Sequence, residues 1–224
     1  MTNQTNQRIT VRRPERAEVP AVAEAYTAAN LHDPVLSWVI HDEDARRRLT
    51  IGTWPETTAA YLESILHSGE LVIAEDESGA VAGISLWERI DHSQGTGTPG
   101  LEDPEGAQFI EQAYGEYADR MKLLVELTGQ RQPKDTHWYL LNIVVDSGRR
   151  GQGFGGAMLR EQLGRLDAEG EPVYLEASSP RNRALYERVG FTDLGDPIEL
   201  PDGPRLQPMW RPASVEAQRS HSTG

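Results

Sequence analysis

Residues 140–156 read LLNIVVDSGRRGQGFGG, and this stretch joins an apolar run to a basic, glycine-dense turn. The apolar residues 140–145 predict a strand, and a helix is expected to begin near Phe154. Glycine lets the backbone adopt positive φ and approach a ligand closely, so several N–H groups can converge on one anion. The N-terminus of the helix adds unpaired donors and partial positive charge. The stretch therefore predicts a phosphate-binding turn.

Two nucleotide-binding patterns fit this turn. Gly151, Gly153 and Gly156 match G-x-G-x-x-G, and Glu176 follows at the spacing of a ribose-binding acid, which is typical of a dinucleotide-binding oxidoreductase. Against this interpretation, residues 146–150 separate the strand from the first glycine, and few residues follow Glu176 for further βαβ units. A nucleoside-triphosphate loop requires a Lys that this turn lacks.

Taken from Arg150, the same turn reads Arg-Gly-Gln-Gly-Phe-Gly and matches [QR]-x-x-G-x-[GA]. This pattern resembles the pyrophosphate loop of the GNAT superfamily of N-acetyltransferases. The continuation LEASSPRNRALYERVGF at residues 175–191 is similar to the second half of that superfamily, and within it to the group of puromycin N-acetyltransferases. The resemblance is strong over residues 137–211, and over residues 8–136 it rests mainly on the order of elements.

The resemblance implies that acetyl-CoA is bound as a co-substrate, with no metal. In that superfamily the loop amides bind the coenzyme A pyrophosphate, and main-chain groups of the preceding strand contact the pantetheine arm. The implied cofactor-binding residues are Ile143, Val144, Val145, Arg150, Gly151, Gln152, Gly153, Phe154, Gly155, Gly156 and Asn182. Arg149 is expected either to contact a phosphate as well or to be a solvated surface charge.

Two residues are the candidate catalytic pair. The resemblance implies that Tyr186 is the general acid that protonates the leaving thiolate, with Asn182 on the same helical face and with Leu185 and Val189 facing the core. Glu176 is a candidate general base, because strand alternation places it opposite the apolar face of residues 173–177. The alternatives are that Glu176 pairs with an Arg or is solvated, and that Tyr186 only covers the core.

The acceptor pocket is expected in the amino-terminal half, where aromatic residues are candidates to line it. We expect at least two of a set of six to face the acceptor: Trp38, Trp54, Trp87, Trp138, Tyr26 and Tyr139. A backbone N–H of Val144 or Val145 is the expected oxyanion donor. The histidines lack metal-ligand spacing.

Bulk composition narrows the class of protein. The chain has 224 residues and a formal net charge of -13, which argues against nucleic acid or an anionic membrane as a partner. It has no Cys, which excludes a disulfide framework and a cysteine nucleophile. The polar N-terminus and the lack of a long apolar run predict a soluble, cytoplasmic protein. We expect one domain over residues 8–212, disordered tails at 1–7 and 213–224, and a monomer or homodimer.

The pattern of elements predicts an α/β (α+β) fold with a mixed, mostly antiparallel sheet of about seven strands and four or five helices. Residues 31–48 are expected to be a loop with some helix. The predicted helices include one that carries Ile110 to Leu124 on its apolar face, and another over 154–169. The predicted strands include hairpins at 71–87 and 191–211.

The combined expectation is an acetyl-CoA-dependent N-acetyltransferase that transfers acetyl directly to a primary amine of a small molecule, such as an aminonucleoside or another antibiotic. The alternative is an acyl-CoA-binding sensor or partner module without transferase activity.

Overall fold

A computed structural model describes residues 8–52, 54–91, 93 and 104–214. Its central sheet has the strand order β1-β2-β3-β4-β5-β8-β6, and β7 pairs with β8. The strands are β1 (Thr10–Arg12), β2 (Glu70–Glu75), β3 (Val81–Ile90), β4 (His137–Val145), β5 (Val173–Ala177), β6 (Thr192–Asp193), β7 (Ile198–Glu199) and β8 (Arg205–Arg211).

The direction of the strands excludes one of the two nucleotide-binding folds. Among the described residues every strand pairing is antiparallel except that of β4 with β5. A dinucleotide-binding fold needs a mostly parallel, doubly wound sheet. The prediction of a mixed, mostly antiparallel sheet is therefore confirmed, and the dinucleotide interpretation of the glycine turn is wrong.

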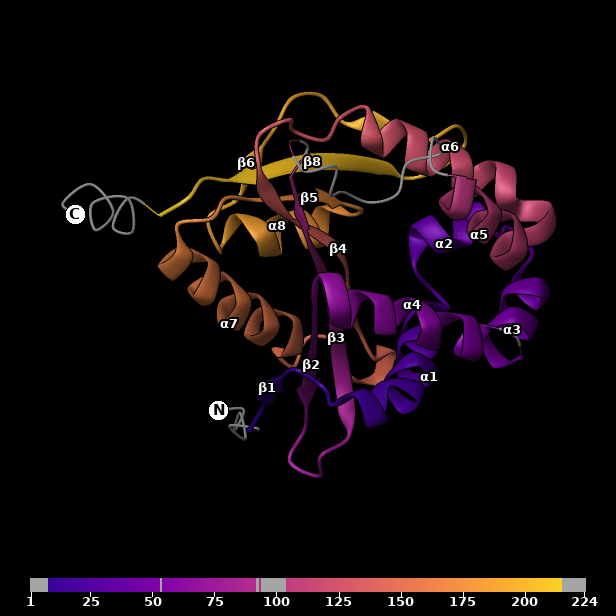
Figure 1. Ribbon diagram of the computed structural model, residues 1–224, viewed down its shortest axis with the longest axis horizontal. Helices are drawn as coiled ribbons and strands as arrows, with labels where there is room; N and C mark the ends of the chain where they lie inside the picture. The colour runs from indigo at the N-terminus through magenta and orange to yellow at the C-terminus, as the bar shows by residue number, and fades with distance from the viewer. Residues whose placement is uncertain (1–7, 53, 92, 94–103, 215–224) are drawn as a thin grey trace, which may run out of the picture.

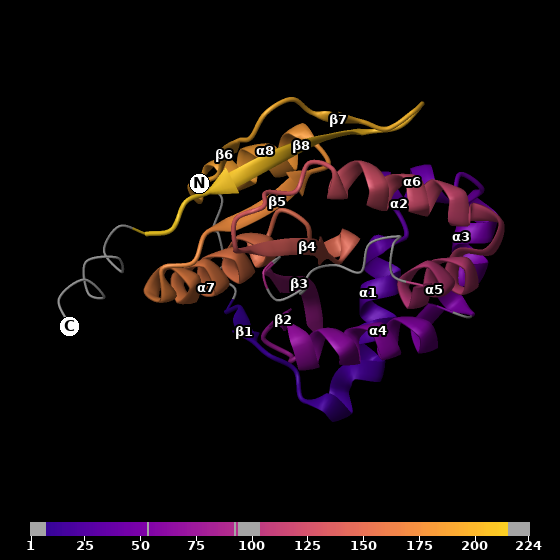
Figure 2. The ribbon, with the colours of Figure 1, turned by 45° about the horizontal axis from the view of Figure 1, so that its top comes forward.

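Helices cover both faces of the sheet (Figure 1). They are α1 (Val19–Asn30), α2 (Pro34–Val39), α3 (Glu43–Ile51), α4 (Trp54–Ser68), α5 (Pro104–Tyr114), α6 (Ala118–Gly129), α7 (Phe154–Glu169) and α8 (Pro180–Glu187). Helices α7 and α8 pack on one face, and α1 and α4 on the other. Helices α2, α5 and α6 gather beyond the α1 and α4 layer, away from α7 (Figures 1 and 2).

The carboxy-terminal half follows its sequence pattern closely. Met158, Leu159, Leu163 and Leu166 recur at helical spacing along α7, and all four are buried against the sheet. Helix α8 begins where Ser179 accepts a hydrogen bond from the Asn182 N–H, with Pro180 in the first turn. The chain then reverses at Gly190, whose φ is +95°.

Three segments differ from the sequence-based expectation. The helix expected around Ile110 to Leu124 is two helices, α5 and α6, because the chain breaks at Gly115, where φ is +52°. The strand expected over 191–200 is interrupted between β6 and β7, where Gly195 has φ +70° and Pro197 cannot donate a ladder hydrogen bond. The loop expected over 31–48 is largely helical, because Asp33 and Asp42 cap α2 and α3.

Some expectations cannot be compared with the structure. The expected tails at 1–7 and 215–224, and most of the loop at 91–104, lie outside the described residues. The eight α-helices that the described part of the chain contains exceed the four or five expected. None of the described helices is both long enough and apolar enough to cross a membrane.

Candidate functional site

Strands β4 and β5 begin side by side and then separate. Their parallel pairing is limited to Trp138 opposite Val173 and Tyr139 opposite Tyr174, although β4 continues to Val145 and β5 to Ala177. The two strands spread toward their carboxyl ends (Figure 2). Main-chain groups on this side of β4 therefore lack a strand partner beyond Tyr139. Ile143, Val144 and Val145 lie on this part of β4, as the expectation of a coenzyme-binding strand requires.

A β-bulge shifts the side chains of β4 at the same place. Asn142 lies opposite Leu86 and Leu140 opposite Trp87, so Leu141 is the extra residue. A bulge bends the strand and changes which side chains face each side. Oδ1 of Asn142 is buried without a hydrogen-bond partner among the described residues. The sequence does not predict this bulge, because β4 reads as an uninterrupted apolar run.

The glycine turn forms a cradle of unpaired N–H groups. Gly151 and Gly153 have φ of +83° and +98°, in the left-handed region that side chains disfavour. Gly153 is also the N-cap of α7, so the first N–H groups of that helix point outward. Among the described residues no acceptor receives the N–H groups of Gly151, Gly153, Phe154, Gly155 and Gly156. This geometry suits a pyrophosphate, which accepts several hydrogen bonds at once.

The two arginines before the turn have different environments. Arg149 Nη1 is paired with Oδ2 of Asp76 in the β2–β3 turn. Hydrogen bonds from Ser78 and then from Arg149 hold the pKa of Asp76 well below its usual range. Arg150 is exposed, and its one hydrogen bond to the described residues is a long contact of 3.4 Å from Nε to the Val145 carbonyl. Arg149 therefore fastens the turn to the sheet, whereas Arg150 remains available to an anion.

Two further cations lie beside the cradle. Nη2 of Arg181, on α8, is 3.7 Å from where a Cβ on Gly151 would lie. Nη1 of Arg160, one turn into α7, is 3.2 Å from the corresponding position on Gly156. The sequence analysis did not assign a role to either arginine. The spacing of Arg160, four residues after Gly156 on one helix, is the signal that could have found it.

Glu176 faces the opening between the strands and has an uneven environment. The Tyr139 hydroxyl donates a hydrogen bond of 2.7 Å to Oε2 of Glu176. Oε1 is buried with no partner among the described residues. Burial raises the pKa of the Glu176 carboxyl to about 7, although the Tyr139 hydrogen bond acts in the opposite direction. A carboxyl with this pKa exchanges a proton near neutral pH.

The strand alternation around Glu176 agrees with the sequence. Val173, Leu175 and Ala177 are buried in the core beneath α7. Tyr174 packs with Tyr139 on the opposite face. The Tyr174 hydroxyl lies near Glu176 and, like Tyr139 but to a smaller extent, lowers the pKa of that carboxyl. Glu176 takes part in no ion pair with the described cations, so the alternative of an Arg-paired carboxylate has no support.

Tyr186 is more buried than its helical position predicts. Its side chain is 4% exposed and belongs to the core beneath α7, with its ring 5.9 Å from that of Phe191. Leu185 and Val189, which were expected to be the core residues of this helix, are half-buried. The expectation that Tyr186 projects away from the core is wrong, because its ring packs into the core beneath α7, beside Phe191.

The hydroxyl of Tyr186 nevertheless lies close to the acidic part of the site. Burial raises the pKa of Tyr186, and the charges of Asp33 and Glu176 raise it further. The phenol is therefore neutral at physiological pH and retains a proton to donate. Asp33, at the start of α2, accepts hydrogen bonds from Val35 and Leu36 N–H and was not expected as part of the site.

Asn182 follows Glu176 along the chain, in the first turn of α8. Its Nδ2 donates a long hydrogen bond of 3.4 Å to Oγ of Ser178, and its main-chain N–H binds Ser179. The Gln152 side chain turns back to the Gly148 carbonyl. The contacts of both residues with coenzyme remain predictions.

The candidate acceptor aromatics divide into two groups. Trp38, Trp54 and Trp87 are buried, and each indole N–H donates within the protein, to Pro201 O, Ala113 O and Ser85 Oγ respectively. Trp138 is also buried, in the core beneath α7. Tyr139 faces the opening through Glu176. Burial also raises the pKa of Tyr26, with Asp33 among the nearby charges. The indole N–H of Trp138 is buried without a partner among the described residues. The tyrosines and Trp138 therefore remain candidates for the acceptor pocket, whereas the other three tryptophans are held by hydrogen bonds within the protein.

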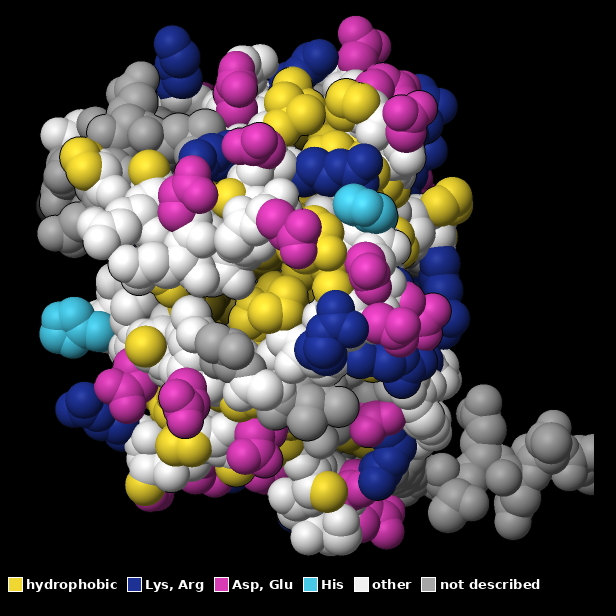
Figure 3. Space-filling model, turned by 90° about the vertical axis from the view of Figure 1, so that its right-hand side faces the viewer, with side chains coloured by type: hydrophobic (Ala, Val, Ile, Leu, Met, Phe, Trp, Pro, Cys, Tyr) yellow, Lys and Arg dark blue, Asp and Glu magenta, His cyan; other side chains and the backbone are white. Residues whose placement is uncertain are grey.

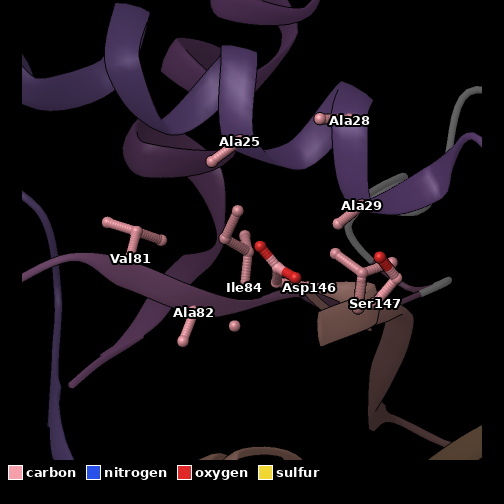
Figure 4. A pocket seen from close by; sticks show the side chains of 10 residues that line it. Ala25, Ala28, Ala29, Val81, Ala82, Ile84, Asp146 and Ser147 are labelled. Carbon is pink, nitrogen blue, oxygen red and sulfur yellow. The ribbon is translucent and has the colours of Figure 1, made fainter. Parts of the chain in front are cut away.

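A cavity of about 160 Å³ lies between α1 and the carboxyl end of β4 (Figure 4). Ala25, Ala28 and Ala29 form its helical wall, and Asp146 and Ser147 lie where the chain enters the glycine turn. Neither Glu176 nor Tyr186 lines it. The cavity therefore adjoins the cradle and is separate from the candidate catalytic pair. The described residues contain no cluster of three or more typical metal ligands.

Part of the chain matches a known family of proteins. Residues 110–193 match the family model of an acetyltransferase (GNAT) domain. An uncharacterised N-acetyltransferase of Schizosaccharomyces pombe is 36% identical over 61 residues, which are 27% of this chain and 25% of that protein. This chain therefore matches only about a quarter of the length of that relative.

Two solved structures extend the likeness to the whole fold. A Corynebacterium glutamicum protein described as a histone acetyltransferase and related acetyltransferase is 26% identical, with a TM-score of 0.63 over 92% of this chain and 97% of that one. A phosphinothricin acetyltransferase of Sinorhizobium meliloti, solved in complex with AcCoA, is 18% identical, with a TM-score of 0.56 over 92% of this chain and 89% of that one. The chain has the GNAT fold, and residues 110–193 match the family model of the GNAT acetyltransferase domain.

Proposed function

We propose that this protein is an acetyl-CoA-dependent N-acetyltransferase that acts directly on the primary amine of a small molecule. One observation carries the proposal: the opening between β4 and β5 has an anion cradle at one side and a buried, unpaired carboxylate oxygen on β5. A phosphate-bearing acyl donor and a proton-releasing acceptor need these two features. The phosphinothricin acetyltransferase with bound AcCoA shares the fold and supports the choice of donor.

The cradle residues fit the phosphates of coenzyme A. The unpaired N–H groups of Gly151 and Gly153–Gly156 would bind the pyrophosphate, and Arg150 would offset its charge. Unpaired main-chain groups of Ile143–Val145 would hold the pantetheine amides. Bound acetyl-CoA supplies a thioester carbonyl that an amine can attack, with the thiol as leaving group.

The catalytic pair would manage the protons. Glu176 accepts a proton from the attacking amine, which keeps the nitrogen lone pair available. Tyr186 keeps its phenolic proton and donates a hydrogen bond to the leaving sulfur. The ordinary phenol pKa of about 10 already exceeds the thiol value of about 8.5, and burial of Tyr186 widens the gap. Hydrogen-bond donation by Tyr186 is therefore favoured over complete proton transfer.

An amine acceptor agrees with the charge of the protein. The chain carries a formal net charge of -13, which attracts a cationic ligand. Acidic and basic side chains lie together around exposed hydrophobic ones on the face formed by the helices at the right of Figure 1 (Figure 3). We propose a small organic amine with an apolar part, such as an aminonucleoside or another antibiotic, as the acceptor.

The test separates donor binding from transfer. Calorimetric titration should show acetyl-CoA binding and no NADH binding. Thiol release should then appear with at least one member of a panel of primary amines that includes puromycin. Acetyl-CoA binding with no thiol release across the panel would favour the acyl-CoA-binding module instead, and the lack of acetyl-CoA binding would reject both.

A further inference from the structure

A hydrogen bond between side chains ties β4 to β5 at the point where the strands separate. Tyr139 lies opposite Tyr174 in the last paired position of the parallel register. Its hydroxyl reaches across to Glu176, two residues further along β5, and donates to Oε2 at 2.7 Å. The Tyr139 ring is itself fixed, because it is buried against Ile90 and Tyr174. The hydrogen bond therefore holds Glu176 in one orientation.

The two oxygens of Glu176 differ because of this contact. Oε2 has a donor, whereas Oε1 is buried and has none among the described residues. Buried polar atoms in folded proteins nearly always have partners, so an orphaned acceptor at an opening indicates a ligand that donates. Asn142 Oδ1, on the adjacent strand, is a second buried acceptor without a partner. A primary amine, with two N–H groups to donate, matches such acceptors.

We propose that Tyr139 is a positioning residue for the transfer reaction, holding Oε2 of Glu176 so that Oε1 receives the proton of the acceptor amine. This inference rests on the proposed function. In the transfer, the amine nitrogen forms a bond to the acetyl carbon and the carbon–sulfur bond breaks, with its electron pair leaving on sulfur. The N–H bond that breaks leaves its electron pair on nitrogen, and its proton forms an O–H bond at Oε1.

The titratable groups around Glu176 set the direction of the pH effect. They are Tyr139 on β4, Tyr174 on β5 and Tyr186 on α8, whereas β8 places Pro208 opposite Glu176. The hydrogen bond from Tyr139 favours the ionised carboxylate and partly offsets the effect of burial. Removing the hydroxyl should therefore raise the pKa of Glu176 further, and less of the base would be ionised at neutral pH.

The decisive variant is Tyr139→Phe, made in the full chain and compared with Tyr174→Phe. Tyr174 is a neighbouring buried phenol that also lowers the pKa of Glu176, but by less than Tyr139 does, so it controls for loss of a buried phenolic oxygen and should give a smaller shift. Rates with acetyl-CoA and the amine found by the panel are measured from pH 5 to 9. We expect the acidic limb of kcat/KM to move up by about one pH unit in Tyr139→Phe, from a starting pKa of about 7, which would lower the rate near pH 7 about fivefold. The rate should recover at pH 9, with acetyl-CoA affinity unchanged.

The outcomes separate this inference from the proposed function. A fall in rate at every pH with an unshifted limb in Tyr139→Phe, or an equal shift in Tyr174→Phe, would overturn the positioning role and leave the transferase intact. Titration of the Glu176 carboxyl by carbon-13 NMR measures the effect of the same hydrogen bond on the carboxyl pKa without turnover. The signal is assigned by its loss in Glu176→Gln. A third outcome is that the carboxyl pKa rises in Tyr139→Phe but the protein acetylates no amine. This outcome would overturn the proposed transferase function, and with it the proton transfer to Oε1.

Discussion

The coenzyme half of the molecule, from β4 to β8, and the acceptor half, from β1 to α6, differ in how directly sequence predicts structure. In the coenzyme half the strand at 137–145, the helix at 154–169 and the cap at Ser179 lie where their patterns place them. In the acceptor half one expected helix is two, and an expected loop is helical. The exception in the coenzyme half is the strand expected over 191–200, which is interrupted at Gly195. The departures in the acceptor half come from the positive φ of Gly115 and from the caps at Asp33 and Asp42, which the hydrophobic periodicity does not show.

The roles of individual arginine and tryptophan side chains also depend on which contacts they make in the folded protein. Arg149 and Arg150 are neighbours in sequence, yet one is paired with Asp76 and the other is exposed. Trp38, from the acceptor half, donates to the Pro201 carbonyl at 2.7 Å and lies under Arg120. Such contacts depend on residues far away in the chain. A comparison of variants in the two halves should therefore separate coenzyme binding and chemistry from stability.

The largest effect is expected from Glu176→Gln. Gln is nearly isosteric but cannot accept a proton, so kcat should fall by about 10²- to 10⁴-fold, with acetyl-CoA affinity nearly unchanged. Tyr186→Phe removes only a hydrogen-bond donor and should cost about tenfold. Steady-state rates and calorimetric titration provide the two readouts. If the Glu176→Gln enzyme remained active, the general base would have to be another residue of the site.

A smaller effect is expected from Gly153→Ala. The φ of +98° disfavours a side chain by about 1–2 kcal/mol, so the cradle should distort and acetyl-CoA affinity should fall about tenfold. The control is Gly164→Ala, in the middle of α7, where an added Cβ meets nothing within 4 Å. That control should be slightly stabilised, with unchanged affinity. Equal affinities in both variants would mean that the left-handed turn does not bind the donor.

Variants of Arg149 and Arg150 test whether positive charge at the cradle contributes to acetyl-CoA binding. Arg150→Ala should weaken acetyl-CoA about fivefold, because an exposed cation loses part of its value to solvent screening, and this loss should shrink at high salt. Arg149→Ala should instead lower the free energy of unfolding, because Asp76 loses its partner, with little change in affinity. Calorimetry and thermal unfolding of both variants give the comparison. If Arg149→Ala weakened acetyl-CoA binding and Arg150→Ala lowered the free energy of unfolding, the two arginines would have the opposite roles.

The smallest effect on coenzyme binding is expected in the acceptor half. Trp38→Phe removes the indole N–H that binds Pro201 and should lower the free energy of unfolding by about 1–2 kcal/mol. Acetyl-CoA affinity should not change, because Trp38 packs in a core formed by α2, α3 and the β7–β8 hairpin. Chemical denaturation and calorimetry measure the two quantities. A large loss of acetyl-CoA affinity would show that the two halves are coupled.

Much of the candidate site could be predicted from sequence because its signals are local. The cradle follows from glycines that permit positive φ at 151 and 153, and the face of Glu176 follows from strand alternation. Tyr186 was placed in the right helix but with the wrong exposure, since helical spacing does not show how a short helix tilts over a sheet end. Arg160 and Arg181 were missed because their approach to the cradle depends on how α7 and α8 pack.

The sequence by itself determined a phosphate cradle at the N-terminus of α7, a carboxylate on β5 and an acidic chain without cysteine. Only the tertiary structure decided that β4 and β5 separate after a single short stretch of pairing, and that a bulge at Leu141 lies at the opening. It also decided that Tyr139 holds one oxygen of Glu176 and leaves the other unpaired. The physical reason is that dihedral preferences and side-chain periodicity act over a few residues. Strand separation and cross-strand hydrogen bonds depend on segments that meet only after folding.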